Sequence, residues 1–105
     1  MTLFYKSLAE IAGTFAMIFV GAGSILLSER YPQTVSAHWI PLAWGGTIAL
    51  MIFAMGRISG AHFNPAVTLA FVAADRFPVN QIPLYWGSQF FGGFMAVSLL
   101  KAIGR

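Results

Sequence analysis

The stretch ISGAHFNPAVTLAFVAA, residues 58–74, contains no charged side chain, yet it cannot cross a bilayer as one helix. Gly60 and Pro65 interrupt it, because proline inside a helix removes a hydrogen bond and clashes with the preceding turn. The roughly ten residues that follow Asn64 would form a helix ~15 Å long, about half of a ~30 Å hydrocarbon core. The sequence therefore predicts a re-entrant segment that enters the membrane and turns back.

Asn64 and Pro65 mark the start of this half-length helix. Asparagine is among the best N-cap residues, and proline at the first helical position has no N–H group to leave unsatisfied. The positive end of the helix dipole would then lie near the middle of the membrane. The preceding residues 58–63 would be extended backbone at membrane depth, which is tolerated only inside protein or along a water-filled cavity. This segment predicts a route for a permeant.

Long apolar segments flank the re-entrant segment on both sides. The chain is 58% hydrophobic and only 9% charged, whereas soluble domains carry about 25% charged residues. Each apolar segment is close to the ~20 residues that a membrane-crossing helix needs. We expect an all-α membrane protein in which residues 1–105 form a single unit, with three transmembrane helices and one re-entrant half-helix. The expected spans are about 3–27, 39–56 and 82–100, and the re-entrant part is about 58–74.

Small residues recur on the faces of these expected spans. Ser88, Gly92 and Ala96 are spaced four positions apart, and Gly13 and Gly21 fall in the first span. Helices in lipid approach one another closely where such residues meet. The stripe therefore predicts helix packing.

Several functional classes are disfavoured by the composition. The six Lys and Arg residues are scattered, so the sequence offers no basic run for nucleic acid. There is no cysteine, and no catalytic triad, metal cluster or phosphate-binding loop is evident. The N-terminal apolar stretch contains Lys6 and Glu10 and does not have the layout of a cleavable signal. We expect a protein that is not an enzyme and has no catalytic residue, metal or cofactor.

The segment SGAHFNPAVTLA resembles the first signature of the major intrinsic proteins, the family of aquaporins and glycerol facilitators. AEIAGTF in the first span and AWGGT in the second are similar to the same family. The resemblance covers essentially the whole chain. It implies a pore built from two three-span repeats that are inverted relative to each other, each contributing one Asn-Pro-Ala half-helix.

The resemblance also implies roles for individual residues. Asn64 would donate its side-chain N–H to passing water or solute, and Pro65 and Ala66 would hold the cap and the contact between half-helices. A row of backbone carbonyls would line one vestibule, at Gly60, Ala61, His62 and Phe63. Glu10 would sit inside the bundle and accept hydrogen bonds from the re-entrant loop, as expected for an intramembrane carboxylate. For His62 and Glu10 a purely structural role remains the alternative.

The first of the family's four selectivity positions, twenty residues before the first-signature Asn, falls on Trp44. A tryptophan there resembles the glycerol facilitators and the nodulin-like intrinsic proteins, which implies glycerol, boric acid or arsenous acid as solutes beside water. The selectivity arginine follows the family's second signature, and its counterpart here is Val67. If a second copy completed the pore, Trp44 of one copy would face Ile52, Ala61 and Val67 of the other.

One repeat alone would leave the re-entrant backbone open to lipid, which a bilayer does not tolerate. The chain is therefore expected either to be a fragment or to pair with an inverted copy of itself, with four such pores side by side as a further possibility of the family. Under the topology that the resemblance implies, the Lys and Arg residues divide evenly between the two sides, as dual topology would require: Lys6, Arg57 and Arg76 inside against Arg30, Lys101 and Arg105 outside.

The leading hypothesis is a passive pore for water and small uncharged solutes in a cell membrane, inner or plasma. The alternative is a non-conducting fragment or assembly subunit. An ion-coupled transporter would need more intramembrane ionisable groups than Glu10 and His62.

Overall fold

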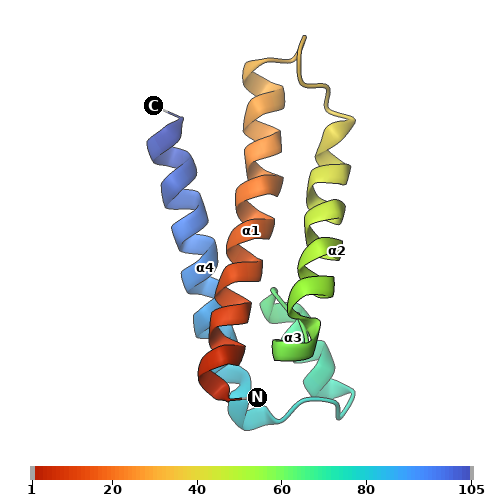
Figure 1. The fold of residues 1–105 in the computed structure, drawn as a ribbon, viewed down its shortest axis with the longest axis vertical. Helices are drawn as coiled ribbons and strands as arrows, with labels where there is room; N and C mark the ends of the chain where they lie inside the picture. The colour runs from red at the N-terminus through yellow and green to blue at the C-terminus, as the bar shows by residue number, and fades with distance from the viewer. Residues whose placement is uncertain (1, 105) are drawn as a thin grey trace.

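The computed structural model describes residues 2–104, which form four α-helices and one short 3-10 helix (Figure 1). Three long helices run along the molecule, and α3 is much shorter. The elements are α1 (Leu3–Arg30), α2 (Trp39–Ser59), α3 (Pro65–Ala73), η1 (Val79–Gln81) and α4 (Ile82–Ile103). Helix α1 packs against both α2 and α4, while α3 packs against α4. The all-helical fold class is confirmed for the described residues.

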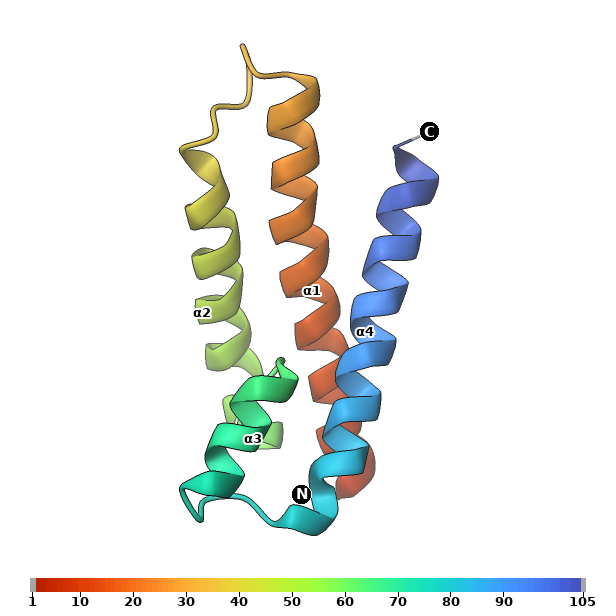
Figure 2. The same cartoon turned by 180° about the vertical axis from the view of Figure 1, so that it is seen from behind.

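Helix α3 occupies only one end of the bundle. It begins near the middle of the long axis and runs toward the end at which the N-terminus lies (Figure 2). The polar turn after it, which includes Asp75 at φ 57°, leads back through η1 into α4. The chain between α2 and α4 therefore enters the bundle and leaves again at the same end.

The long helices extend beyond the expected spans by about one turn each. Helix α1 continues through Arg30 instead of ending near residue 27, and Pro32 follows directly after its C-cap, Tyr31. Polar residues outside the hydrocarbon can remain helical until a proline restricts the residue before it. Helix α4 likewise continues to Ile103.

The start of the re-entrant loop differs from the prediction. Ile58 and Ser59 are the last residues of α2 and are not extended. The helix ends because Gly60 takes a left-handed conformation at φ 87° and donates its N–H to the carbonyl of Gly56. Glycine adopts this conformation without the steric cost that a Cβ carries. The non-helical loop therefore comprises residues 60–64.

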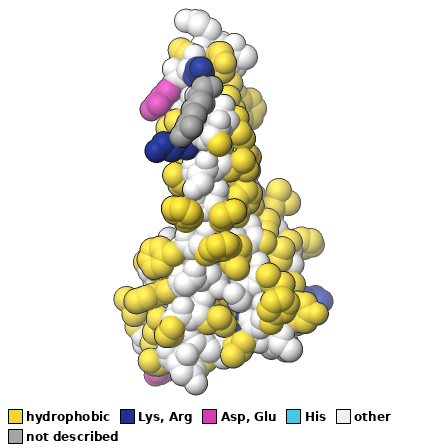
Figure 3. All heavy atoms as spheres, turned by 90° about the vertical axis from the view of Figure 1, so that its left-hand side faces the viewer, with side chains coloured by type: hydrophobic (Ala, Val, Ile, Leu, Met, Phe, Trp, Pro, Cys, Tyr) yellow, Lys and Arg dark blue, Asp and Glu magenta, His cyan; other side chains and the backbone are white. Residues whose placement is uncertain are grey.

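The interior of the described chain is polar and its surface is apolar. Glu10, Thr68 and Gln89 are almost completely buried, whereas Phe53 and Phe94 are 90% and 70% exposed. Hydrophobic side chains are spread along the whole face shown in Figure 3, and the charged side chains lie toward its ends. Such a surface is suited to lipid, where backbone and polar groups must be satisfied inside the protein.

Within residues 2–104, two helices are long and apolar enough to cross a membrane, α1 and α2. Helix α4 has 22 residues, a length of ~33 Å, and its buried face carries the polar residues Ser88 and Gln89.

Small residues bring α4 against α1, as the sequence predicts. Ser88, Gly92 and Ala96 are all buried, and the hydroxyl oxygens of Ser7 and Ser88 lie 2.6 Å apart. A Cβ placed on Gly92 would lie 2.6 Å from the carbonyl oxygen of Ile11. The two backbones therefore meet at a distance that only glycine allows.

Replacing Gly92 by Ala should destabilise the protein by about 1–3 kcal/mol, because the added methyl group overlaps the α1 backbone and forces the helices apart. Gly87→Ala is the matched control, since a Cβ there meets nothing within 4 Å. Thermal unfolding in detergent should show a lower midpoint for the first variant and an equal or higher one for the second. Equal midpoints would contradict the close contact.

Candidate functional site

The loop at residues 60–64 has an unusual backbone. Ala61 and Phe63 both have φ 56°, a region that non-glycine residues rarely occupy. Both side chains are buried, and the ring of Phe63 occupies the space over Gly13 of α1. Such a conformation persists only where the surrounding structure holds it, and strained positions of this kind cluster at functional sites.

Glu10 of α1 holds the loop in place. Its side chain is completely buried, and its two carboxylate oxygens accept four hydrogen bonds. Oε2 accepts from the hydroxyl of Ser59 at 2.7 Å and from the N–H of His62 at 3.0 Å. Oε1 accepts from the N–H of Phe63 and from Nε2 of Gln89, both at 2.8 Å. The carboxylate thus satisfies loop N–H groups that would otherwise be buried without a partner.

The N–H groups of Gly60 and Ala61 also point into the protein. The N–H of Ala61 donates to the hydroxyl of Ser59 at 3.1 Å, and the N–H of Gly60 donates to α2. In contrast, no hydrogen bond between residues in the range 2–104 ends on a carbonyl oxygen of residues 60–63. The loop therefore turns its donors inward and leaves a row of acceptors unpaired.

A second polar cluster fixes the side chain of His62. Nδ1 of His62 and the hydroxyl of Thr68 lie 2.8 Å apart, and Nε2 of Gln89 donates to the same hydroxyl at 3.0 Å. The imidazole ring stacks on Phe71 with centroids 4.6 Å apart and contacts Tyr85 at 4.9 Å. This side chain is therefore part of the packing beneath the loop.

Asn64 caps α3 as the sequence predicts. Its Oδ1 accepts from the N–H of Ala66 at 2.8 Å, and Pro65 occupies the first helical position. The indole N–H of Trp86 donates to the carbonyl of Pro65 at 3.2 Å, which ties the start of α3 to α4. The amide nitrogen of Asn64 has no partner among residues 2–104 and belongs to an exposed residue. It is a donor free to bind something outside the chain.

The loop lies between two hollows. Phe63 and Asn64 line a mainly apolar one of about 300 Å³, which also includes Thr14, Gln89 and Gly93. Two of its buried polar atoms, the hydroxyl of Thr14 and Oε1 of Gln89, have no partner in the described part of the chain. Gly60 and His62 line the other, of about 520 Å³, whose wall includes three cations: Lys6, Arg57 and Arg76.

The three expected selectivity residues are not gathered at this site. The ring of Trp44 packs on α1, where it fills the space over Gly21. Ile52 and Val67 are exposed, and none of the three lines the hollow beside Asn64. Within one chain these residues form no common constriction.

Three residues of the site carried no prediction from sequence: Thr68, Tyr85 and Gln89. Tyr85 donates its hydroxyl to the carbonyl of Ser59 at 2.6 Å, so it holds the end of α2. Gln89 is a buried amide within an apolar helix. A polar amide in such a segment needs a hydrogen-bond partner, and this was the sequence signal that could have predicted its place in the site.

These features define a helical membrane protein with a half-length helix and a polar loop folded into its interior, the arrangement of channels and transporters. Comparison with known proteins identifies the family. The Major intrinsic protein family model matches residues 1–105, and the chain belongs to that family.

The relatives lie in the nodulin-like branch that the sequence resembles. The chain is 42% identical to Aquaporin NIP3-1 of Arabidopsis thaliana over 98 residues, 93% of this chain and 30% of the relative. It is 41% identical to Aquaporin NIP1-1 of Oryza sativa subsp. japonica over 96 residues, 91% and 34% of the two chains. Nodulin-26 of Glycine max is 38% identical over 98 residues, which cover 93% of this chain and 36% of Nodulin-26. The chain thus spans about a third of the length of these relatives.

Proposed function

We propose that this chain forms one half of a passive membrane pore for water and small uncharged solutes, completed by a second half. The observation that carries the proposal is the loop at 60–64, in which the N–H groups of His62 and Phe63 donate to Glu10 and the carbonyl oxygens of residues 60–63 have no partner among residues 2–104. Backbone of this kind is tolerated at membrane depth only where it is buried in protein or lines a water-filled cavity, and unpaired carbonyl oxygens favour the second case. Major intrinsic protein aquaporins are channels and not enzymes, which supports the same proposal.

The proposed path runs along the loop from one hollow to the other. A permeant entering beside Gly60 and His62 would exchange water for the carbonyl oxygens of residues 60–63 and then meet the free amide of Asn64. Acceptors in a row followed by a central donor replace part of the hydration shell of a neutral molecule. The positive end of the α3 dipole at Asn64 would oppose cations.

The proposal requires α4 to be a third span, beside α1 and α2. Its length of 22 residues is sufficient for a ~30 Å core. Its polar side chains Ser88 and Gln89 are buried against α1 and the loop, so they need not face lipid. The protein would then be a multi-pass protein of a cell membrane.

For the solute, we propose a neutral molecule of the glycerol or metalloid-acid type in addition to water. Trp44 supports this choice, because the family resemblance assigns it to the selectivity position, where glycerol facilitators and nodulin-like proteins resemble this chain in carrying tryptophan. The names of the relatives, aquaporins and Nodulin-26, agree with a water or solute pore without specifying a substrate.

For the second half, we propose an inverted copy of the same chain. Lys6, Arg57 and Arg76 line one hollow, and Arg30 contacts Gly104 at the other end of the bundle. Basic residues at both ends support insertion of the chain in either direction. Arg105, the sixth residue in the count of three against three, lies outside the described residues. The particle mass in detergent separates one chain, two chains and an eight-chain assembly of four pores.

Swelling of proteoliposomes tests the proposed function directly. Vesicles that contain the 105-residue chain alone should exchange water or glycerol faster than protein-free vesicles of the same lipid. Permeability equal to that of the lipid background in vesicles that hold folded dimers would contradict it. The protein would then be a non-conducting fragment or an assembly subunit, which is the second candidate.

In the inverted dimer, Val67→Arg should reduce glycerol permeability by roughly tenfold, an added barrier of ~1.4 kcal/mol. The reason is that the longer side chain would project beside Trp44 of the second copy and narrow the mouth. Val79→Arg, at an exposed position in η1, is the control. Unchanged water and glycerol permeability in the Val67 variant would count against the inverted geometry.

A further inference from the structure

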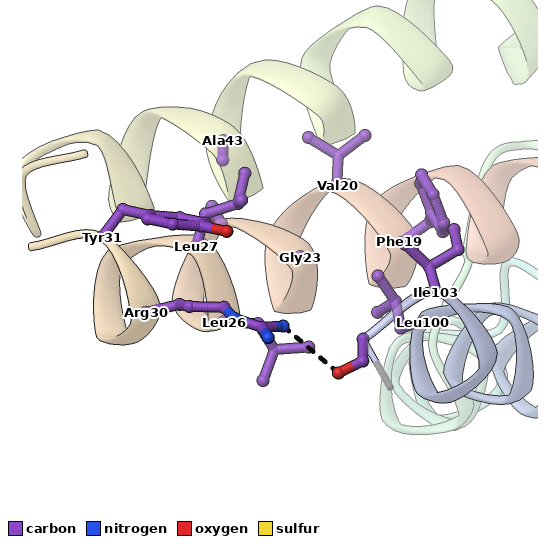
Figure 4. Close-up of a pocket in the computed structure, with 12 residues that line it drawn as sticks. Phe19, Val20, Gly23, Leu26, Leu27, Arg30, Tyr31, Ala43, Leu100 and Ile103 are labelled. Carbon is purple, nitrogen blue, oxygen red and sulfur yellow. Dashed lines mark hydrogen bonds between the residues drawn. The ribbon is translucent and has the colours of Figure 1, made fainter. Parts of the chain in front are cut away.

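A groove of about 510 Å³ runs along the upper half of α1, far from the loop at 60–64. Figure 4 shows its lining, in which Gly23 of α1 provides a floor without a side chain. The walls are apolar and include Val20, Leu27, Ala43 and Leu100. A Cβ on Gly23 would be 3.5 Å from the side chain of Leu100, an ordinary contact distance, and the volume of the groove is the room for an occupant.

The groove lies on the opposite side of α1 from the proposed pore. The groove is lined by residues 20, 23, 27 and 30, whereas residues 14, 17 and 18 line the hollow beside Asn64. At 100° per residue, the two sets are centred roughly 150° apart around the helix axis. A second half that covers Asn64 would therefore leave the groove facing the bilayer.

The length of the groove matches one leaflet of a bilayer. Its lining extends along α1 from Phe19 to Arg30, a rise of ~16 Å, and half of the hydrocarbon core is ~15 Å thick. Arg30 and Tyr31 close the end at which α1 terminates. An aromatic and a basic residue at that level are suited to the headgroup region.

Arg30 supplies the charge at the closed end of the groove. One guanidinium nitrogen, Nη1, donates to the carbonyl of Gly104 at 3.2 Å in an exposed position (Figure 4). Guanidinium groups have five N–H donors in a planar fork that fits phosphate. The others have no hydrogen-bond partner among residues 2–104 and are available for a ligand. The nearby charged residues Glu29 and Lys101 do not line the groove.

We infer that the groove binds one anionic phospholipid, with an acyl chain along Gly23 and the phosphate at Arg30. An apolar trough one leaflet long that ends at an arginine is complementary to a lipid of that charge. A zwitterionic lipid also carries a positively charged group, which would lie beside the guanidinium of Arg30 and be repelled by it. The inference does not depend on conduction through the pore.

Native mass spectrometry of the full chain in detergent tests this inference with phosphatidylglycerol and phosphatidylcholine of identical acyl chains. One phosphatidylglycerol should be retained at concentrations at which phosphatidylcholine is lost. Arg30→Gln should weaken phosphatidylglycerol binding by roughly fivefold, as expected for one basic residue near an anionic headgroup. Lys101→Gln removes the same charge at the same end outside the groove and should have a much smaller effect.

Variants that fill the groove provide a second, independent test of lipid binding. Gly23→Phe should abolish retention of the lipid, whereas Gly87→Phe, which adds the same ring in open space on α4, should not. Equal retention of the two lipids, or equal losses in the Arg30 and Lys101 variants, would overturn the inference. A disulfide-linked dimer of the Gly23→Cys variant would also overturn it, because a second copy would then cover the groove; the chain has no other cysteine.

Discussion

Replacing Glu10 by Gln should release the loop at 60–64 and destabilise the protein by roughly 3 kcal/mol, since each buried group left unsatisfied costs about 1–3 kcal/mol. Oε1 accepts the N–H of Phe63 and Oε2 accepts the N–H of His62. Whichever oxygen the amide nitrogen replaces, a donor would face a backbone donor. The substitution is therefore disruptive although it conserves size.

Two measurements separate this effect from general destabilisation. Hydrogen exchange at the amides of His62 and Phe63 should become fast, and solute permeability should fall to the lipid background. Glu29→Gln is the matched control, because Glu29 is an exposed carboxylate on the same helix. If the Glu10 variant kept slow exchange at both amides, the carboxylate would not be what holds the loop.

The second large effect is expected from Asn64→Asp. Aspartate caps a helix as well as asparagine does, so its carboxylate should still accept the N–H of Ala66 and α3 should remain folded. The variant loses the free amide donor and gains a negative charge at the same point. Flux of neutral solute should fall about tenfold for the loss of one hydrogen bond of ~1.4 kcal/mol, and a cation leak should appear.

Asn80→Asp provides the control for charge alone, because Asn80 lies in η1 and is exposed. Its thermal midpoint, solute flux and cation leak should match those of the parent chain. The midpoint of the Asn64 variant should also be close to the parent value, which would show that the cap is intact. Unchanged flux with no leak in that variant would show that the amide does not meet the permeant.

The parts of this fold that could be predicted from sequence are those set by local chemistry. Asn64 and Pro65 specify the start of α3 whatever surrounds them, and the small residues around Gly92 specify where two helices can meet. Helix ends were less certain, because polar residues beyond the hydrocarbon can continue a helix. Ser59 shows this, since α2 continues to it and ends only where Gly60 adopts a left-handed conformation.

The candidate site was predictable only in part. A buried carboxylate in an apolar span must find donors, and the family resemblance implied a loop contact for Glu10, but neither identifies the donors themselves. Gln89 lies 79 positions away in the chain and meets Glu10 only because α4 packs on α1. Thr68 and Tyr85 join the site in the same way, through contacts between helices.

By itself, the sequence determined the membrane class, the half-length helix and its cap at Asn64, because apolar length and capping depend on neighbouring residues. Only the tertiary structure decided which groups satisfy the loop and which face of α1 carries the groove at Gly23. Those features depend on side chains far apart in the chain meeting at hydrogen-bond distance, and a linear pattern of polarity does not contain that information.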